Sequence, residues 1–393
     1  MDFAYLCSEC GLVLEITQDI MVCPECSRLQ RDGEPLRGIL EVVIFGELPE
    51  NWNIHDMLPV KRQFFPEIPV GNTPLWKPEK LRSELGFMEL YIKDDTRNPT
   101  NSLKDRASLL VSAFARRFNI GDIAVASTGN AASSMAGIGA SANQNIVIFV
   151  PESAPQAKLV QAIQYGARVL PVAGNYDMAF DISLEYSKLT GALSRNTAYN
   201  PMTIEGKKTV AVEIAQQLGN APDHVFVPVG DGAIIGGVFK GFEDLLEYKI
   251  IDKMPKIYAV QAMGSSAICH AKENGDFKMK IPAVTLADSI SVDVPRNGYY
   301  ALNKLRKHNG ECIIVSDEEI LDAQKFLSSY AGCFAEPSGA AAMAGFLNRK
   351  DNIPIGESIV LLITGSGLKD IDSAKRRIKM PSHSIKNAEE AIF

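Results

Sequence analysis

Over most of its length the chain alternates short runs rich in β-branched residues with longer stretches of helical character. The short runs are Leu90–Lys93, Ile123–Ala126, Ile146–Val150, Ala167–Val172, Val225–Val229, Ile257–Val260, Cys312–Val315 and Ile359–Ile363. Such alternation is typical of α/β proteins built on mainly parallel sheets. Helix starts are also marked, because Ser316 and Glu319 have the spacing of a capping box and Pro155 suits a first helical turn. The sequence therefore predicts an α/β fold.

Length and composition limit the classes of protein to which the chain can belong. Its 393 residues, 46% hydrophobic and 22% charged, are ordinary for a globular protein of two or three domains. A net charge of −7 argues against a nucleic-acid or anionic-membrane surface. The longest apolar runs have strand length, whereas a membrane span needs about 20 apolar residues. With no signal peptide apparent, we expect a cytoplasmic protein without nucleic-acid or membrane partners.

Four of the seven cysteines form two Cys-x-x-Cys pairs near the N-terminus, Cys7 with Cys10 and Cys23 with Cys26. Two such pairs present four thiolates to one tetrahedral zinc ion. Disulfides suit a chain without export signals less well, and a redox Cys-x-x-Cys would occur once, at the start of a helix. We therefore predict a structural zinc ribbon over residues 1–45, with short strands at Leu12–Ile16 and Asp19–Val22. Acidic residues outnumber arginines eight to three in this segment, which disfavours nucleic acid as its partner.

Polar or glycine-rich loops follow several predicted strands, where ligands bind in parallel α/β folds: Ser127–Asn130, Gly230–Gly236 and Thr364–Gly367. In the second loop, glycines let backbone N–H groups at the start of a helix approach a phosphate. A dinucleotide site would need an acidic residue at the end of the next strand, which ends instead in Gln261. A small phosphorylated ligand is therefore favoured. We expect the carboxylate of Asp231 to point away from this phosphate.

Lys104 begins a predicted helix after the loop Asn98–Leu103. The helix has an apolar face, so the amine is a candidate for burial. Burial lowers the pKa of a lysine and makes it useful as a nucleophile and a base. The alternative is a solvated lysine paired with Asp105.

The remaining loops suit the parts of an aromatic cofactor and its substrate. The hydroxyls of Ser127 and Thr128 suit a substrate carboxylate, and Asn130 suits a ring hydroxyl, although a capping turn alone would explain this loop better. A hydroxyl from Thr364 opposite a pyridine nitrogen would leave the ring unprotonated, which disfavours transamination and permits elimination. An amine for an aldehyde, a loop for a phosphate and a partner for a ring nitrogen together predict pyridoxal 5'-phosphate (PLP).

Taken together, these segments resemble the fold-type II PLP enzymes and, within them, the threonine synthases. The resemblance is carried by Gly71–Leu75, Asn98–Arg106, Ser127–Asn130, Asn200–Thr209, Pro228–Gly232, Phe334–Ser338 and Thr364–Asp370. An N-terminal zinc-ribbon-like segment also occurs in some threonine synthases. The resemblance implies a tryptophan synthase β-like fold of two parallel-sheet α/β domains, and a homodimer. We assign residues 46–97 and 199–393 to the large PLP-binding domain, residues 98–198 to the small domain and residues 1–45 to the ribbon.

The resemblance also implies a reaction and a site. The reaction converts O-phospho-L-homoserine and water to L-threonine and phosphate. Lys104 would be catalytic and bind PLP covalently, Asn130 would contact the PLP ring oxygen, and Thr364 would face the pyridine nitrogen. The PLP phosphate would be held by Gly230, Asp231, Gly232, Ala233 and Ile234. The substrate carboxylate would be held by Ser127, Thr128 and Asn130, and Arg106 would lie near the substrate phosphate.

The chain departs from the threonine synthase pattern where the substrate phosphate binds. An Asn-Ser pair and an arginine are usual around the Asn-Pro step, and those positions here are Thr197, Ala198 and Thr203. A lost guanidinium removes charge-assisted hydrogen bonds worth about 1.5–3 kcal/mol each. Either other cations replace it, or the substrate differs; the candidate cations are Lys207, Lys208 and Arg296. Ala131, Ser366 and the stretch Ala287–Arg296 depart too, and we expect that stretch to line the substrate side.

Two alternatives stay open. PLP-dependent β-elimination or β-replacement on a serine-like amino acid (O-phosphoserine with sulfite or sulfide, or serine/threonine deamination) needs Lys104 but no γ-phosphate site. A catalytically silent binding or scaffold protein is disfavoured, because Lys104, Asn130, the glycine loop and Thr364 occur together.

Overall fold

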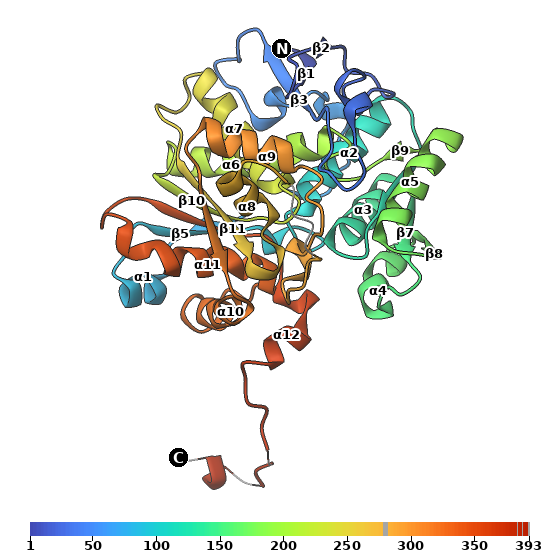
Figure 1. The fold of residues 1–393 in the computed structure, drawn as a ribbon. Coiled ribbons are helices and arrows are strands. Elements are labelled where there is room, and N and C mark those ends of the chain that lie inside the picture. Colours follow the sequence, from blue (N-terminus) through green and yellow to red (C-terminus); the bar gives the residue numbers. More distant parts are fainter. Residues whose placement is uncertain (278–281, 383, 387, 392–393) are drawn as a thin grey trace.

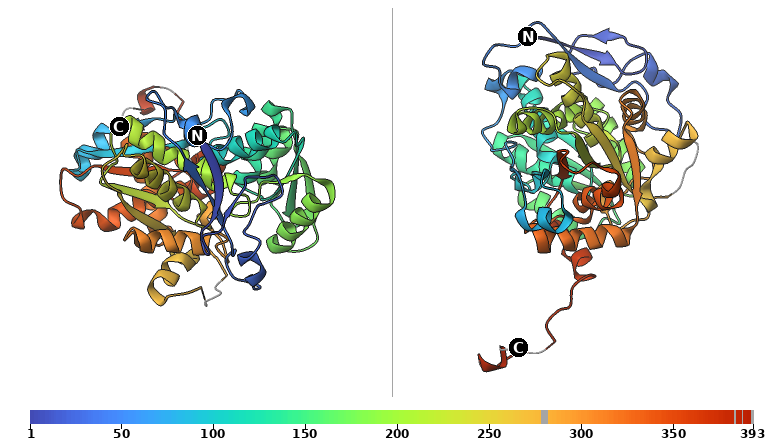
Figure 2. Two further views of the ribbon diagram at one scale, coloured as in Figure 1. Left: turned by 90° about the horizontal axis from the view of Figure 1, so that it is seen from above. Right: turned by 90° about the vertical axis from the view of Figure 1, so that its left-hand side faces the viewer.

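The structure is a computed structural model that describes residues 1–277, 282–382, 384–386 and 388–391. Within these residues the strands form a three-stranded sheet near the N-terminus, a six-stranded sheet and a four-stranded sheet. Figure 1 shows the two larger sheets side by side with helices around them, and the small N-terminal sheet at one end. Residues 376–382 extend away from the body beyond α12 (Ile371–Lys375), as Figure 2 also shows. No described helix is long and apolar enough to cross a membrane.

The six-stranded sheet supports one wall of the cavity described below. In spatial order its strands are β12 (Glu311–Val315), β11 (Lys256–Ala262), β10 (His224–Pro228), β13 (Ile359–Ile363), β5 (Leu90–Asp94) and β4 (Leu75–Trp76). The first five run parallel, and β4 is antiparallel to β5. Successive residues of β10 pack on opposite faces, since Val225 and Val227 join one apolar cluster and Phe226 joins another. Both faces of the strand are therefore buried, which is typical of parallel sheets.

Helices cover the two faces of this sheet. The face of Val225 carries α6 (Met202–Leu218), α7 (Ala233–Glu247), α8 (Ala267–Asn274) and α9 (Gly298–Lys307), and the face of Phe226 carries α1 (Glu79–Leu85), α10 (Asp317–Ala331) and α11 (Pro337–Arg349). The predicted capping box of Ser316 and Glu319 begins α10, with both of its hydrogen bonds formed. The structure thus confirms that helix start.

The four-stranded sheet is wholly parallel. Its strands are β8 (Arg168–Val172), β7 (Asn145–Pro151), β6 (Asp122–Ala126) and β9 (Leu193–Ser194). One face packs with α2 (Lys104–Arg117), α3 (Asn130–Ala142) and α4 (Gln156–Gln164), and the other with α5 (Tyr176–Thr190). Each of the eight predicted strand runs is found within two residues of its expected bounds, which confirms the α/β prediction. The domain boundaries themselves stay predictions.

The N-terminal sheet differs from its prediction. Its strands are β1 (Asp2–Cys7), β2 (Val13–Leu14) and β3 (Leu40–Phe45), and β1 pairs antiparallel with both others. The predicted strand Leu12–Ile16 shrinks to β2, and the predicted strand Asp19–Val22 makes a single bridge from Val22 to Ile39. The prediction of two strands between the cysteine pairs is therefore confirmed in part for Leu12–Ile16 and wrong for Asp19–Val22. The long pairing forms where residues alternate in burial, and that alternation lies in β3, after the second pair.

This small sheet is packed against the body of the protein. Tyr5 and Val42 are buried in the same apolar cluster as Phe114 of α2. The backbone N–H of Val42 also donates to Glu205 Oε1 of α6 at 3.3 Å. The N-terminal segment therefore shares a core with the helices that support the cavity.

The same segment contacts α9 and the loop before it. The backbone N–H of Leu36 donates to the carbonyl of Arg296 at 2.9 Å. The carboxylate of Glu41 accepts hydrogen bonds from the Tyr300 hydroxyl at 2.7 Å and from Lys304 Nζ at 2.8 Å. Residues 34–41 therefore support the end of the stretch that was expected to line the substrate side.

Candidate active site

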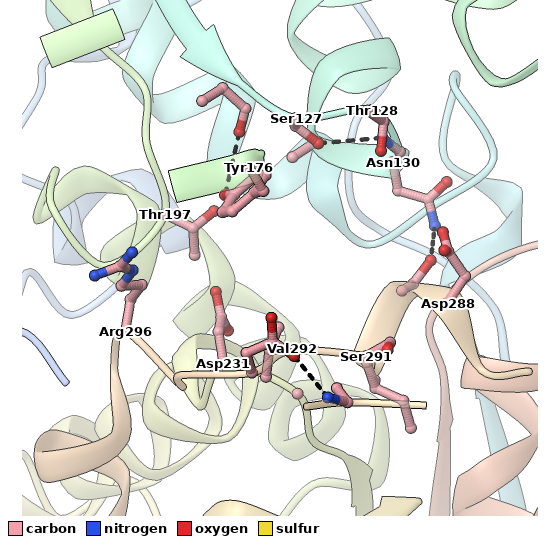
Figure 3. A pocket seen from close by; sticks show the side chains of 18 of the residues that line it. Ser127, Thr128, Asn130, Tyr176, Thr197, Asp231, Asp288, Ser291, Val292 and Arg296 are labelled. Carbon is pink, nitrogen blue, oxygen red and sulfur yellow. Dashed lines mark hydrogen bonds between the residues drawn. The ribbon is translucent and has the colours of Figure 1, made fainter. Parts of the chain in front are cut away.

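A cavity of about 390 Å³ opens at the carboxyl ends of strands from both larger sheets. It is lined by Lys104, by Ser127–Ala131 after β6, by Gly230 and Asp231 after β10, and by Asp288–Val294 with Arg296. Figure 3 shows Asp231 and Arg296 across the cavity from Ser127, Thr128 and Asn130. Parallel α/β folds bind their ligands at such strand ends. The expectation that the stretch Ala287–Arg296 lines this cavity is confirmed for Asp288–Val294 and Arg296.

Lys104 is the first residue of α2 and faces the cavity. Burial lowers the pKa of its amine, nearby carboxylates oppose this change in part, and Arg195 adds to it. Asp105 is not its partner, because the Asp105 carboxylate accepts hydrogen bonds from the backbone N–H of Thr100 at 2.7 Å and from the Thr100 hydroxyl. A lysine with a lowered pKa is more often neutral, and the neutral amine attacks an aldehyde or accepts a proton.

Asn130 begins α3, and its amide meets a buried carboxyl group that the sequence analysis did not single out. Asn130 Nδ2 donates to the two carboxylate oxygens of Glu336 at 2.9 and 3.1 Å and to Ser289 Oγ at 3.1 Å. Burial raises the pKa of Glu336, and the hydrogen bond from Asn130 partly offsets that effect. The available signal was a carboxylate directly before Pro337, the first residue of α11. Glu336 is placed to hydrogen-bond a group that approaches Asn130.

The loop at the start of α7 is shaped for close approach, but its acidic residue is not where we expected it. Gly232 has φ +90°, and a Cβ there would lie 2.8 Å from Ala301 Cβ. Asp231 lines the cavity, and its Oδ1 accepts a hydrogen bond from the backbone N–H of Ala233 at 2.9 Å. The expectation that Asp231 points away is therefore wrong, because its carboxylate caps the positive end of α7. Gly230 and Ile234 also line the cavity, whereas Gly232 and Ala233 are not among its lining residues.

The hydroxyl residues after β6 and β13 lie in different settings. Ser127 and Thr128 line the cavity, and Ser127 Oγ accepts a hydrogen bond from the backbone N–H of Gly129 at 3.2 Å. Thr364 is buried beyond the lining residues, and its carbonyl accepts a hydrogen bond from the backbone N–H of Leu103 at 2.9 Å. Thr364 therefore ties the end of β13 to the residue before Lys104, and its role toward a pyridine nitrogen stays a prediction.

Arg106 lies in a buried ionic network and not on the cavity wall. Its guanidinium donates to Asp95 Oδ2 at 2.6 Å, to Glu213 Oε1 and Oε2 at 2.6 and 2.7 Å, and to the Thr73 hydroxyl at 3.0 Å. Burial raises the pKa of Glu213, but Arg106 and Lys93 outweigh it and bring that pKa to about 2. The structure thus contradicts the expectation that Arg106 lies near a substrate phosphate, since these carboxylates occupy its donors.

The four N-terminal cysteines converge on one point. Their sulfur atoms all lie within 4.8 Å of one another, with Cys7 Sγ 3.7 Å from Cys26 Sγ and Cys10 Sγ 3.7 Å from Cys23 Sγ. A tetrahedron with zinc–sulfur distances of about 2.3 Å requires sulfur–sulfur distances of about 3.8 Å. The geometry therefore suits a tetrahedral metal ion.

Comparison with known proteins agrees with this arrangement. Residues 67–365 match the family model described as pyridoxal-phosphate dependent enzyme. A threonine synthase of Methanocaldococcus jannaschii is 35% identical over 386 residues, which cover 95% of this chain and 95% of that protein. The chain belongs to the threonine synthase family. A threonine synthase of Methanosarcina acetivorans is 34% identical, over 99% of this chain and 94% of that protein.

Solved structures related to this family share the fold. Threonine deaminase isoform 2 from Solanum lycopersicum superposes with a TM-score of 0.69 and 26% identity, covering 85% of this chain and 97% of that one. Maize serine racemase gives a TM-score of 0.67 at 22% identity, covering 76% of this chain and 88% of that one. The fold-type II prediction is confirmed.

The positions that depart from the family pattern carry no cation of their own. Thr197 lines the cavity, Ala198 is buried with φ 69°, and Thr203 Oγ1 donates to the carbonyl of Asn200 at 2.8 Å. The substituted residues are thus accommodated by the fold without supplying charge at these points.

Two of the three candidate replacement cations are already paired. Lys208 Nζ lies 2.6 Å from Glu205 and 2.8 Å from Asp244, and Arg296 forms an ion pair with Asp177. Lys207 is fully buried, and its Nζ has no hydrogen-bond partner within the part of the chain that the structure describes. This leaves Lys207 as the unpaired candidate.

Sequence reasoning missed a further cation, Arg195, which directly follows β9 and lies two residues before Thr197. Its Nη1 donates to Thr197 Oγ1 at 2.9 Å. The rule that selected the other loops, a polar residue at the end of a parallel strand, would also have selected this arginine. It was overlooked because β9 is a strand of two residues without a β-branched run.

Proposed function

We propose that this protein is a PLP-dependent threonine synthase, a carbon–oxygen lyase that converts O-phospho-L-homoserine and water to L-threonine and phosphate. The observation that carries the proposal is the position of Lys104. Its amine has a lowered pKa and faces a cavity shared with Asn130 and the start of α7. Membership of the threonine synthase family supports the choice of reaction.

The residues around the cavity fit PLP. Lys104 would bind it covalently, Asn130 and Glu336 would contact its ring substituents, and Gly230 to Ile234 would receive its phosphate at the start of α7. For this, the Asp231 carboxylate would have to release the backbone N–H of Ala233, which would then donate to the phosphate. When bound, PLP withdraws electrons from the Cα of an attached amino acid and so stabilises the carbanion formed there.

Proton transfer falls to Lys104. It would take the proton from the substrate Cα and later one from Cβ, after which the γ-phosphate leaves and water adds at Cβ. Ser127 and Thr128 would orient the substrate carboxylate beside the start of α3. No histidine lines the cavity within the described residues, so a histidine relay has no support there.

A second reaction is favoured by one observation. Thr197, Ala198 and Thr203 bring no charge to the positions where the family binds a γ-phosphate. β-Elimination or β-replacement on a serine-like amino acid would use the same lysine and would not need that charge.

Substrate turnover separates the two reactions. We expect the PLP-loaded protein to release phosphate from O-phospho-L-homoserine with L-threonine as the product, measured by a phosphate assay and amino-acid analysis. O-phosphoserine, with and without sulfite or sulfide, and serine and threonine serve as parallel substrates. Turnover of one of these, with no phosphate released from O-phospho-L-homoserine, would replace the proposed reaction by the second.

We further propose that the four N-terminal thiolates hold one structural zinc ion. Cys23→Ser should lower zinc affinity at least about tenfold and lower the thermal midpoint, because the metal closes a segment too small to fold alone. Metal analysis and thermal unfolding check this. Cys312→Ser, far away in β12, is the control. Equal zinc content in the two variants would contradict the proposal.

The homodimer and the cytoplasmic location also belong to the proposal. Both rest on the family resemblance and on the features of the sequence. Light scattering on the purified protein tests the oligomeric state, with a mass of two chains as the expected result.

A further inference from the structure

Arg195 is a fully buried cation immediately behind the cavity wall. Its guanidinium donates to Thr197 Oγ1 at 2.9 Å and approaches Ser108 Oγ at 3.3 and 3.4 Å. Thr197 lines the cavity on the side of Arg296 and Asp231 (Figure 3). Within the described residues no carboxylate lies at ion-pair distance from Arg195, so hydroxyl groups alone satisfy it directly.

Lys207 is a second buried cation without an ion-pair partner among the described residues. Its side chain is fully buried, and its Nζ makes no hydrogen bond among the described residues. Burial strongly lowers the pKa of this amine; Lys104 and Arg195 lower it further, and Asp231 opposes them. The charged groups that act on Lys207 are thus Arg195 and two residues of the cavity wall.

The packing of α6 on α7 directs Lys207 toward the start of α7. A Cβ added to Gly237 would lie 2.8 Å from Lys207 Cβ, and one added to Gly241 would lie 2.8 Å from Ala211 Cβ. The second contact lies four residues after the first on each helix, so α6 and α7 run parallel. Long helical side chains lean toward the N-terminus of their helix. Lys207 therefore extends toward the first turn of α7, beside the loop that carries Asp231.

A buried ammonium without a partner destabilises the folded state, so such a group is normally found with an anion. Asp231 acts electrostatically on both cations and Asp105 acts on Arg195, but within the described chain neither carboxylate lies at ion-pair distance from either cation. Lys207 also lies one helical turn after Thr203, the position where the family pattern has an arginine, and residues four apart share a helix face. Neither cation therefore has a directly bound anion among the described residues, and an anion that enters from the cavity would supply one.

We propose that Arg195 and Lys207 form an anion site that binds the phosphate group of a phosphorylated amino-acid substrate. This inference rests on the proposed function for the identity of the substrate class. The pair replaces the positive charge that is missing at Thr197, Ala198 and Thr203. Thr197 accepts a hydrogen bond from Arg195, so its own hydroxyl proton is free to be donated to an anion in the cavity. The phosphate of PLP is the other dianion near this wall, and the experiment separates the two.

The test measures binding of inorganic phosphate to the PLP-loaded protein by calorimetry, alongside PLP affinity from its visible absorbance. Arg195→Gln and Lys207→Met should each weaken phosphate binding about tenfold or more, and leave PLP affinity within about twofold. KM for the phosphorylated substrate should rise in parallel. Arg116→Gln and Lys188→Met, which remove exposed cations, should change neither quantity.

A measurement of thermal stability shows whether weaker phosphate binding in a variant is caused by misfolding. Lys207→Met should raise the thermal midpoint of the cofactor-free protein by about 2–4 °C, because it removes a buried unpaired charge. Weaker phosphate binding in a more stable protein cannot come from misfolding. A variant that loses PLP with phosphate binding unchanged would overturn the inference and assign the pair to the cofactor.

Failure of the proposed reaction and failure of this site give different results. Wild-type protein that binds phosphate through Arg195 and Lys207 but releases none from O-phospho-L-homoserine supports the site and excludes that substrate. Wild-type protein that binds no phosphate, or variants that bind it as tightly as wild type, would overturn the site even if threonine is formed.

Discussion

Lys104→Ala should remove both the visible absorbance of the PLP-loaded protein and, by a factor of about 10³ or more, its turnover. The large expected loss of turnover follows from the two roles proposed for the Lys104 amine. Lys104 is the described lysine on the cavity wall with a pKa lowered by burial, and in the proposed function it would supply both the covalent attachment and the base. Absorbance spectroscopy and phosphate release measure the two effects.

The two readouts also distinguish the roles of Lys104. A variant that keeps PLP by non-covalent contacts, and gains activity on addition of a small primary amine, would show that proton transfer is the main loss. Lys188→Ala, on the exposed face of α5, is the matched control and should behave as wild type. Unchanged turnover in Lys104→Ala would exclude the proposed mechanism.

Arg106→Met should destabilise the fold by about 3–5 kcal/mol without changing KM in the molecules that remain folded. The substitution leaves Asp95 and Glu213 buried without the guanidinium that binds both; within the described residues, Glu213 keeps an ion pair with Lys93 Nζ at 2.8 Å and Asp95 keeps none. Urea unfolding measures the loss of stability. Arg116→Met, on the exposed side of the same helix, should leave stability nearly unchanged.

The network can also be weakened more gently. Glu213→Gln keeps a hydrogen-bonding side chain near Arg106 but removes a carboxylate whose pKa is lowered to about 2. A lowered pKa stabilises the folded state above the ordinary value of 4.5, and this stabilisation is lost as the pH falls toward 2. The variant should lack that part of the acid dependence. A raised KM in either variant would restore the prediction that Arg106 binds substrate.

Much of the fold followed from the sequence because its signals are local. Each strand of the larger sheets is a continuous apolar run such as Ile359–Ile363, and both faces of such a strand are buried, so few alternatives exist. The structure of the N-terminal cysteine segment was harder to predict. Its longest pairing joins β1 to β3 across more than thirty residues, and no local pattern near the cysteines specifies that partner.

For the site residues too, local signals could be predicted and long-range contacts could not. Strand-end position predicted the loops of Asn130 and Gly230, and helix-start position predicted Lys104; all three residues line the cavity. The partners of charged side chains could not be predicted, since Arg106 meets Asp95 and Glu213 from distant segments. The predicted direction of the Asp231 carboxylate was also wrong. The backbone N–H of Ala233, at the N-terminus of α7, binds this carboxylate in competition with any phosphate.

The position of the N-terminal segment limits how the protein can be shortened. Tyr5 and Val42 lie in one core with Phe114, and Glu41 satisfies Tyr300 and Lys304 of α9. Cutting before residue 46 would not release a minimal catalytic unit: it would uncover an apolar face of α2 and leave the Arg296 loop without its backbone partner Leu36. The first 45 residues are thus an integral part of the enzyme, and changes in their sequence are constrained by contacts with the catalytic body as well as by the four cysteines.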